Sequence, residues 1–305
     1  METALITGAT GFIGSWLVEK LLHEGTSVTA VIIEGEEERL ESHIKNAIKI
    51  ICHKPGEIFE ARGLVKGVDV FYNLGWGGVA PEYKNDLELQ MANIRFATDA
   101  VRFAANIGCK RFVGIGSAAE YVYYEGLIKA DTPPSPADLY GAAKISARFM
   151  SQQLADLLGL GFVWAIPSSI FGPRRNDNNI ISYTIRTLLG GKHPSYTKLE
   201  QMWDFLYVQD LIHALYLIGK SGVDRKVYGI GSGTHRPLHE YIEKIRDIID
   251  PSLSLGIGDR PYPHGIIPSS CVDICDLVED TGFKPAVSFD EGIKNTIRHF
   301  ERKIK

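Results

Sequence analysis

Tyr140 and Lys144, four residues apart, are the side chains of this sequence best suited to proton transfer. At that spacing they share one face of a helix, and the apolar residues around them predict a helix over 139–158. A free tyrosine titrates near ~10, so exchanging protons at neutral pH requires its pKa to fall by roughly 3. A neighbouring ammonium in a water-poor site can provide much of that change. The pair alone could be a surface contact, so the surrounding elements decide its meaning.

A glycine-rich turn near the N-terminus supplies that context. The apolar run 4–6 precedes it, and residues 15–22 follow with helical periodicity. Strand, glycine turn and helix together indicate a dinucleotide site. Gly8 permits the tight turn, Gly11 lets the backbone approach a pyrophosphate, and Gly14 lets helix and strand pack closely. The free N–H groups of the helix start would then face the phosphates.

Short apolar runs alternate with helical patterns through the first half of the chain. The expected strands are 28–33, 49–52, 69–74, 111–116 and 161–166, and the longer helices are 87–107 and 139–158. This alternation predicts an α/β fold with a Rossmann-type, doubly wound parallel sheet. Ser117 follows one strand, and the glycine-rich stretch 75–78 follows another, at the edge where ligands bind in such sheets.

The sequence changes character after residue 166. The segment 172–179 is polar and rich in turn-forming residues, and the elements beyond it are shorter. We therefore expect a dinucleotide-binding domain over 1–166, which includes the catalytic candidates. Residues 167–305 are expected to form mainly a smaller C-terminal substrate-binding lobe, which can also return elements to the first domain.

An acidic loop follows the second predicted strand. Its first carboxylate is Glu34, three more follow at 36–38, and Arg39 comes next. If this loop meets the cofactor, its carboxylates repel a 2′-phosphate and Arg39 alone attracts one. Charge therefore favours NAD over NADP, although a solvated acidic loop explains the same residues equally well.

Composition limits the classes of protein that this chain can be. It has 305 residues and a net charge of −4, with no long basic run, so we expect no nucleic-acid partner. No apolar stretch approaches the roughly 20 residues that a membrane helix needs, and a strand begins too early for a signal peptide. Cys271 and Cys275 have no further ligand at metal spacing, so ordinary burial is favoured over a metal site. We expect a reduced, cytoplasmic enzyme without a metal.

With the glycine turn, Ser117, Tyr140 and Lys144 resemble the extended short-chain dehydrogenase/reductase family over nearly the whole chain. The resemblance implies that Tyr140 is the general acid/base. It implies that Lys144 lowers the pKa of Tyr140 and holds the nicotinamide ribose, and that Ser117 binds the substrate oxygen. Members commonly dimerise through the two helices that correspond to 87–107 and 139–158, so a homodimer is expected.

Further segments are similar to the nucleotide-sugar branch of that family. They are 93–98, the Phe-Gly-Pro-Arg turn at 171–174, 203–210 and the closing segment 282–285. The branch implies a nucleoside-diphosphate sugar as the substrate. The candidate cofactor-binding residues are Gly8, Thr10, Gly11, Phe12, Ile13, Gly14, Glu34, Arg39, Leu74, Gly75, Trp76, Tyr140, Lys144 and Pro167. The candidate substrate-binding residues are Trp76, Ser117, Ala118, Ser169, Asn179 and Arg260.

One departure from the branch bears on the reaction. Nucleotide-sugar 4,6-dehydratases commonly follow the catalytic serine or threonine with an acidic pair, whereas here Ala118 and Ala119 follow Ser117. Glu120 comes one position later and should point elsewhere. We therefore expect an NAD(P)-dependent oxidoreductase that acts at C4 of the sugar, first as a 4-keto-sugar reductase and alternatively as a 4-epimerase. A 4,6-dehydratase and a non-catalytic cofactor-binding sensor are the more remote interpretations.

Overall fold

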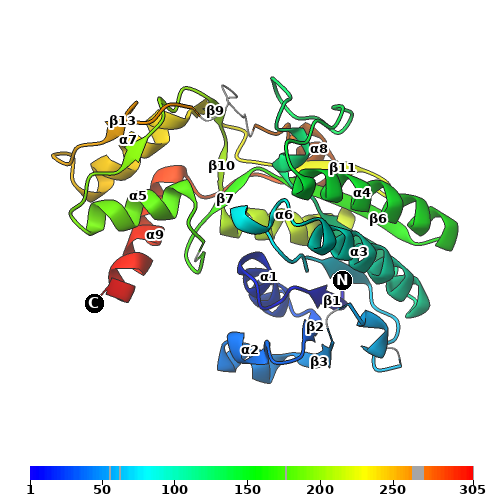
Figure 1. Cartoon of the computed structure of the whole chain (residues 1–305). Coiled ribbons are helices and arrows are strands. Elements are labelled where there is room, and N and C mark those ends of the chain that lie inside the picture. The colour runs from blue at the N-terminus through cyan, green and yellow to red at the C-terminus, as the bar shows by residue number, and fades with distance from the viewer. Residues whose placement is uncertain (55, 62, 176, 263–270, 305) are drawn as a thin grey trace.

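A seven-stranded parallel sheet forms the centre of the computed structural model, which describes residues 1–54, 56–61, 63–175, 177–262 and 271–304 (Figure 1). The strand order is β11-β6-β5-β4-β1-β2-β3, and every neighbouring pair is parallel. The strands are β1 (Thr3–Thr7), β2 (Ser27–Ile33), β3 (Lys49–His53), β4 (Val70–Asn73), β5 (Arg111–Ile115), β6 (Gly161–Pro167) and β11 (Val227–Ile230). The predicted Rossmann-type sheet is confirmed.

Helices cover both faces of this sheet. On one face α3 (Leu87–Asn106) packs against α4 (Leu139–Leu158), and on the other α1 (Phe12–His23) packs against α6 (Val208–Ser221). Successive strand residues point to opposite faces, so Ala4 and Ile6 belong to the core beneath α1, whereas Leu5 belongs to the core beneath α3. This division into two cores is what a parallel sheet buried on both sides requires.

The ends of α4 are defined by local sequence signals. Asp138 is its N-cap, and the Asp138 carboxylate accepts a hydrogen bond of 2.8 Å from the Gly141 backbone N–H. Gly159 ends the helix in the left-handed conformation, with a φ of 64°. The cap fixes Tyr140 in the first turn and Lys144 in the second, beside the carboxyl ends of β4 and β5.

Most of the second half of the chain forms a lobe of short elements. They are β7 (Ser169–Phe171), α5 (Ile180–Leu189), β8 (Ser195–Tyr196), β9 (Met202–Trp203), β10 (Phe205–Tyr207), β12 (Arg236–Pro237), α7 (Leu238–Ile249), β13 (Gly256–Ile257) and α9 (Phe289–Ile304). The strands of the lobe pair two by two, as β7 with β10, β8 with β13, and β9 with β12. Three elements from this half return to the main sheet: β11 joins it, α6 covers one face, and α8 (Cys275–Thr281) packs against both. Figure 1 shows α5, α7 and α9 to one side of the sheet.

Short helices complete the connections around the sheet. They are α2 (Ser42–Ala47), η1 (Glu37–Arg39), η2 (Ile58–Ala61), η3 (Pro81–Tyr83) and η4 (Ala118–Tyr121). Among the described residues, no helix is both long enough and apolar enough to cross a membrane. Large apolar side chains are exposed on both α3 and α4, among them Leu87, Met91, Phe149 and Met150. The homodimer expected through these two helices stays a prediction.

Candidate active site

The glycine turn joins β1 to α1 with its backbone against the end of β4. Gly8 has a φ of 71°, and a Cβ on it would lie 2.8 Å from the Gly75 backbone nitrogen. A Cβ on Gly14 would overlap the Gly8 carbonyl oxygen, so glycine is required at both positions. Gly11 is the N-cap of α1 and offers no side chain, and the first turn holds no acidic residue. The open helix start fits a diphosphate.

Ser117, Tyr140 and Lys144 meet at the carboxyl edge of the sheet, next to that turn. The Ser117 hydroxyl is hydrogen-bonded to the Tyr140 phenol. The Lys144 ammonium lies 5.9 Å from the centre of the Tyr140 ring and donates a 3.0 Å hydrogen bond to the Ile115 carbonyl oxygen. Tyr140 is 9% exposed and Lys144 is 3% exposed. The three predicted catalytic residues are therefore together in a site that excludes most water.

Burial sets the protonation of the two central groups. It raises the pKa of Tyr140 to about 12, an effect that the Ser117 hydrogen bond opposes. Burial also lowers the pKa of Lys144 to about 7, and the negative charge of Glu120 opposes that change. Tyr140 thus holds its proton at neutral pH, whereas Lys144 titrates there. The tyrosine is poised to donate a proton, and it needs additional positive charge nearby before it can accept one.

Glu120 stabilises the segment that carries Ser117. The Glu120 carboxylate accepts a 2.9 Å hydrogen bond from the Ser117 backbone N–H, and this bond completes a capping box at the start of η4. The same carboxylate accepts a 3.4 Å hydrogen bond from the Trp164 indole N–H. The side chain is fully buried, and its second oxygen lies 3.8 Å from the Arg148 guanidinium. This position gives it a structural role beneath the site.

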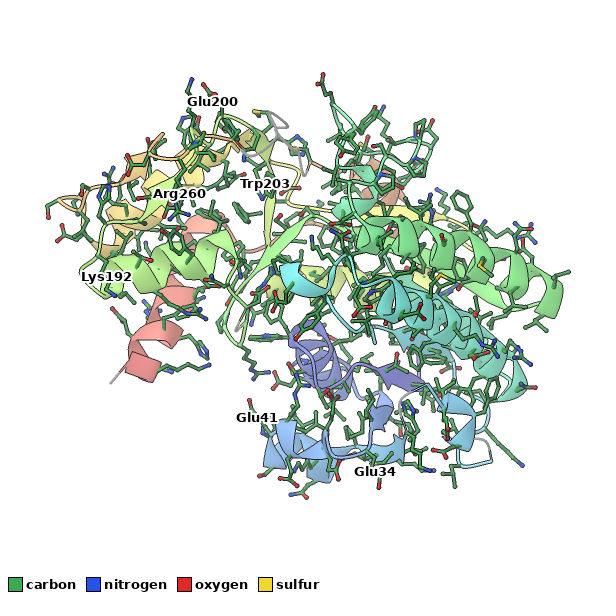
Figure 2. All side chains as sticks on the ribbon, viewed as in Figure 1. Glu34, Glu41, Lys192, Glu200, Trp203 and Arg260 are labelled. Atoms are coloured by element: carbon green, nitrogen blue, oxygen red, sulfur yellow. The ribbon has the colours of Figure 1, made fainter. Side chains whose placement is uncertain are left out.

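The carboxylate that contacts the glycine turn is Glu36. Thr10 donates a 2.8 Å hydrogen bond from its hydroxyl to Glu36, whose other oxygen accepts a 2.8 Å bond from Arg39. Glu34 is exposed, and Figure 2 shows it at the edge of the half that carries β2 and β3. From the sequence alone, Glu36 could not be told apart from the other glutamates at 34, 37 and 38, and its contact with Thr10 becomes visible only in the folded structure.

Other cofactor candidates line the same edge of the sheet. They are Thr10, Phe12 and Ile13 beside the glycine turn, Leu74, Gly75 and Trp76 after β4, and Pro167 at the end of β6; the substrate candidate Ala118 begins η4. The Gly75 backbone N–H donates a 3.3 Å hydrogen bond to the Thr7 hydroxyl, which ties the end of β4 to β1.

The substrate candidates of the second lobe lie on separate segments. Asn179 is the N-cap of α5, and its side-chain oxygen accepts a 3.1 Å hydrogen bond from the Ser182 backbone N–H. Ser169 begins β7. Arg260 follows β13 with an exposed side chain, and Figure 2 shows it in the lobe that carries α5 and α7.

Sequence reasoning missed one further cation near the tyrosine. Arg175 lies 5.7 Å over the Phe12 ring, pairs with Asp177 at 2.7 Å and donates to the Ile170 carbonyl oxygen. Its positive charge acts to lower the pKa of Tyr140. The sequence feature that could have identified Arg175 is its position directly after the Phe-Gly-Pro-Arg turn.

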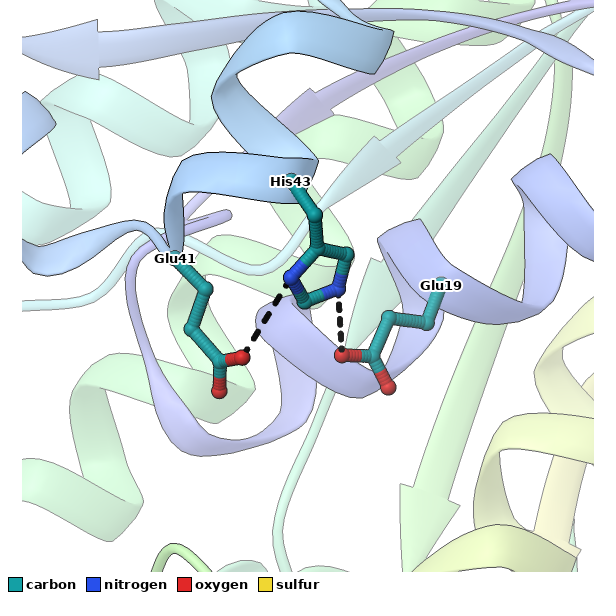
Figure 3. A group of neighbouring side chains, drawn as sticks. All are labelled: Glu19, Glu41 and His43. Atoms are coloured by element: carbon teal, nitrogen blue, oxygen red, sulfur yellow. Dashed lines mark ion pairs between the residues drawn. The ribbon is translucent and has the colours of Figure 1, made fainter.

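A separate group of side chains has metal-ligating atoms within 4.8 Å of one another, Glu19, Glu41 and His43 (Figure 3). His43 lies 3.7 Å from the Glu19 carboxylate and 3.5 Å from that of Glu41. The Arg174 guanidinium approaches the same two carboxylates, at 2.8 Å and 3.6 Å. A cation there would be repelled by Arg174, so we interpret the group as ion pairs that link α1, α2 and the turn after β7.

Residues 4–231 match the NAD dependent epimerase/dehydratase family. The chain belongs to that family. It is 31% identical over 98% of both chains to UDP-N-acetyl-alpha-D-glucosaminuronate decarboxylase of Bacillus cytotoxicus, and 24% identical over 98% of both chains to UDP-glucose 4-epimerase of Mycolicibacterium smegmatis. Among solved structures, UDP-N-acetylglucosamine 4-epimerase from Methanobrevibacter ruminantium has a TM-score of 0.87 with 24% identity, over 99% of both chains.

Membership of the epimerase/dehydratase family confirms the predicted resemblance and the enzymatic, NAD-dependent character of the chain. The residues that surround Gly8, Gly11 and Gly14 fit a dinucleotide, because they leave a turn without side chains against an open helix start. Tyr140 and Lys144 lie where that helix start and β4 converge. The individual roles of the site residues stay proposals.

Proposed function

We propose that this enzyme oxidises and reduces C4 of a UDP-sugar, with Tyr140 exchanging the proton of the C4 oxygen. The buried contact among Ser117, Tyr140 and Lys144 carries this proposal. In a member of the epimerase/dehydratase family, these three residues can act on any substrate carbon that carries a hydroxyl group and a hydrogen that can leave as hydride. The relatives named above act on UDP-sugars by their names, which supports the choice of substrate class.

In this proposal Tyr140 exchanges the proton, Ser117 orients the substrate and Lys144 adjusts the pKa of Tyr140. Ser117 donates a hydrogen bond to the C4 oxygen and orients it toward Tyr140. Tyr140 takes the proton of the C4 hydroxyl during oxidation and returns one to the C4 ketone during reduction. Lys144 favours the tyrosinate through its positive charge. NAD, when bound, would supply the acceptor and donor of the C4 hydride.

The candidates for holding NAD follow from the same geometry. The N–H groups at the start of α1 would hold the diphosphate, and Lys144 would hold the nicotinamide ribose. Glu36, fixed against Thr10, would accept hydrogen bonds from the adenosine ribose hydroxyls and repel a 2′-phosphate. These contacts support NAD in preference to NADP.

Net epimerisation at C4 is the outcome that we favour. An enzyme that retained its cofactor would invert C4 without net consumption of cofactor. Exchange of the cofactor after reduction of the C4 ketone would instead make the enzyme a 4-keto-sugar reductase. Dehydration would require further acid/base groups, whereas Ala118 and Ala119 have none and Glu120 is fully buried.

A substrate panel tests this proposal. The protein is incubated with NAD and, separately, UDP-glucose, UDP-N-acetylglucosamine or UDP-glucuronate, and proton NMR follows the sugar. We expect inversion at C4 of at least one of them, without net formation of NADH. Release of CO₂ from UDP-glucuronate would instead indicate decarboxylation, and a 4-keto-6-deoxy product would contradict the proposal.

A further inference from the structure

The ammonium of Lys144 is covered by an aromatic ring. Its Nζ lies 3.7 Å from the centre of the Trp76 ring, and one hydrogen bond joins it to the Ile115 carbonyl oxygen. Among the described ion pairs none includes Lys144, and Glu120 is the carboxylate whose charge acts on it. A buried ammonium without a bonded carboxylate needs another source of negative potential, and the face of an indole ring supplies one.

Two buried amides on α3 hold that ring in place. The Trp76 indole N–H donates a 3.2 Å hydrogen bond to Gln90, and Gln90 donates to the carbonyl oxygens of Gly78 and Tyr83. Asn93 forms two 2.9 Å hydrogen bonds with the backbone of Gly77. Gln90 and Asn93 are 2% and 7% exposed. The loop after β4 is thus clamped to α3, with the orientation of Trp76 fixed.

The ring also touches the tyrosine. Trp76 and Tyr140 pack edge to face, with ring centres 6.1 Å apart and planes at 90°. One side chain therefore contacts both the proton-exchanging residue and the cation that tunes it.

We infer that Trp76 is a positioning residue for the reaction, because its ring keeps the Lys144 ammonium charged and directed at Tyr140 while Gln90 and Asn93 fix the ring. This inference goes beyond the proposed function and rests on its assignment of proton transfer to Tyr140. It gives a chemical reason for a large aromatic residue within a glycine-rich loop.

Loss of the ring should make Lys144 easier to deprotonate. Burial already lowers its pKa to about 7, so a modest further decrease changes its charge at physiological pH. A desolvated cation–π contact supports an additional decrease of about 1 in pKa, which corresponds to about 1.4 kcal/mol.

Other charged groups face this pair and are left unsubstituted in the variants. They are Glu120 in η4, Arg148 in α4, Lys84 before α3, Asp138 at the N-cap of α4, and Arg175 after β7. A change in the pKa of Lys144 on substitution of Trp76 can therefore be assigned to the ring.

Lysine side-chain NMR of the unliganded protein tests the inference without requiring turnover. The ¹³Cε signal of Lys144, assigned by its absence in Lys144→Met, is titrated in wild type, Trp76→Leu and Trp76→Phe. We expect the pKa of Lys144 to fall by about 1 in Trp76→Leu and by less in Trp76→Phe, since the smaller ring binds cations more weakly. Trp16→Leu is the matched control, because it removes a tryptophan that packs on Arg174 instead. An unchanged pKa in both Trp76 variants, or a rise caused by loss of the burial that the ring provides, would overturn the inference.

The rate profile gives a second readout. If Lys144 must be charged, Trp76→Leu should lose activity at alkaline pH and regain it toward pH 6. The apparent pKa of the alkaline limb of the pH–rate profile should therefore fall by about 1. Equal loss at every pH would mean that the ring only shapes the site, and would overturn the inference. Should Trp76→Leu fail to fold, Gln90→Leu, which releases the indole N–H, is expected to produce a smaller movement in the same direction. Failure of the proposed C4 chemistry would leave the NMR result unaffected.

Discussion

The two halves of the candidate site are built differently. Tyr140 and Lys144 lie on a long helix, are almost fully buried and are held by caps and backbone contacts. Arg260 follows the short strand β13 with an exposed side chain, and Asn179 uses its side chain to cap a helix. Regular elements fix a geometry to the precision that proton transfer needs, whereas short segments can vary without disturbing a sheet. This contrast supports the proposal that the first half determines the reaction type and the second half selects the substrate.

The difference also concerns stability. The sheet side of the site buries an ammonium that is joined to the protein by one carbonyl hydrogen bond and one aromatic ring. Burial of a charge is unfavourable, so the catalytic half should be less stable than an apolar version of itself. The exposed residues of the lobe carry no comparable cost.

The sharpest difference between the halves should come from Tyr140→Phe. Removing the proton donor should reduce turnover by ~10² or more while folding and NAD affinity are kept. Steady-state rates and calorimetric NAD titration measure both properties. Tyr216→Phe, which removes a hydroxyl on α6, should behave as wild type, and near-normal turnover of Tyr140→Phe would remove the tyrosine from the mechanism.

Lys144→Met should separate activity from stability. Turnover should fall, yet the free energy of unfolding at pH 7 should rise by a few kcal/mol, because a native pKa near 7 in place of one near 10.4 costs about 4 kcal/mol there. The unfolded chain binds more protons at Lys144 than the native one between those values, so wild-type stability recovers as pH rises. Urea unfolding should therefore show a smaller difference in the free energy of unfolding between Lys144→Met and wild type at pH 10 than at pH 7. A larger difference at pH 10 would contradict the burial argument.

Cofactor choice should depend on one carboxylate in the first half. We expect wild type to bind NAD at least about tenfold more tightly than NADP, and Glu36→Gln to reduce that preference, because Glu36 faces the glycine turn. Calorimetry with both cofactors decides. Glu38→Gln, at an exposed residue paired with Lys45, is the matched control, and an NADP preference in wild type would assign the dominant role to Arg39.

The smallest effect is expected in the second half. Arg260→Ala should raise KM for a UDP-sugar several-fold with little change in kcat, because the residue would bind the substrate diphosphate away from the reacting carbon. Lys192→Ala, at another exposed cation of the same lobe, serves as control. A loss in kcat without a change in KM would mean that Arg260 takes part in the chemical step, and would contradict the proposed division of roles between the two halves.

The same contrast explains what the sequence could predict. Strand periodicity, glycine spacing and the separation of Tyr140 from Lys144 are local signals, and they predicted the sheet, α4 and the candidate catalytic residues that the fold brings together. The return of β11 to the sheet beside β6 depends on contacts about 60 residues apart, which no local pattern records.

The contacts of individual side chains were beyond the sequence for a related reason. Glu36 differs from its acidic neighbours only through Thr10, and Trp76 reaches Lys144 only because α3 clamps the loop after β4. Glu120 was expected to point away from the reacting groups, and the structure shows it turned back on the Ser117 backbone and buried. Such contacts arise from tertiary packing.

Deuterium at C4 tests the central claim most directly. A UDP-sugar that the enzyme accepts is labelled at C4 and turned over with NAD in ordinary water. If hydride passes between C4 and the nicotinamide while Tyr140 handles only the oxygen-bound proton, the epimerised product keeps the label at C4. Replacement of that label by solvent hydrogen would show that the C4–H bond breaks as a proton, and would contradict the account.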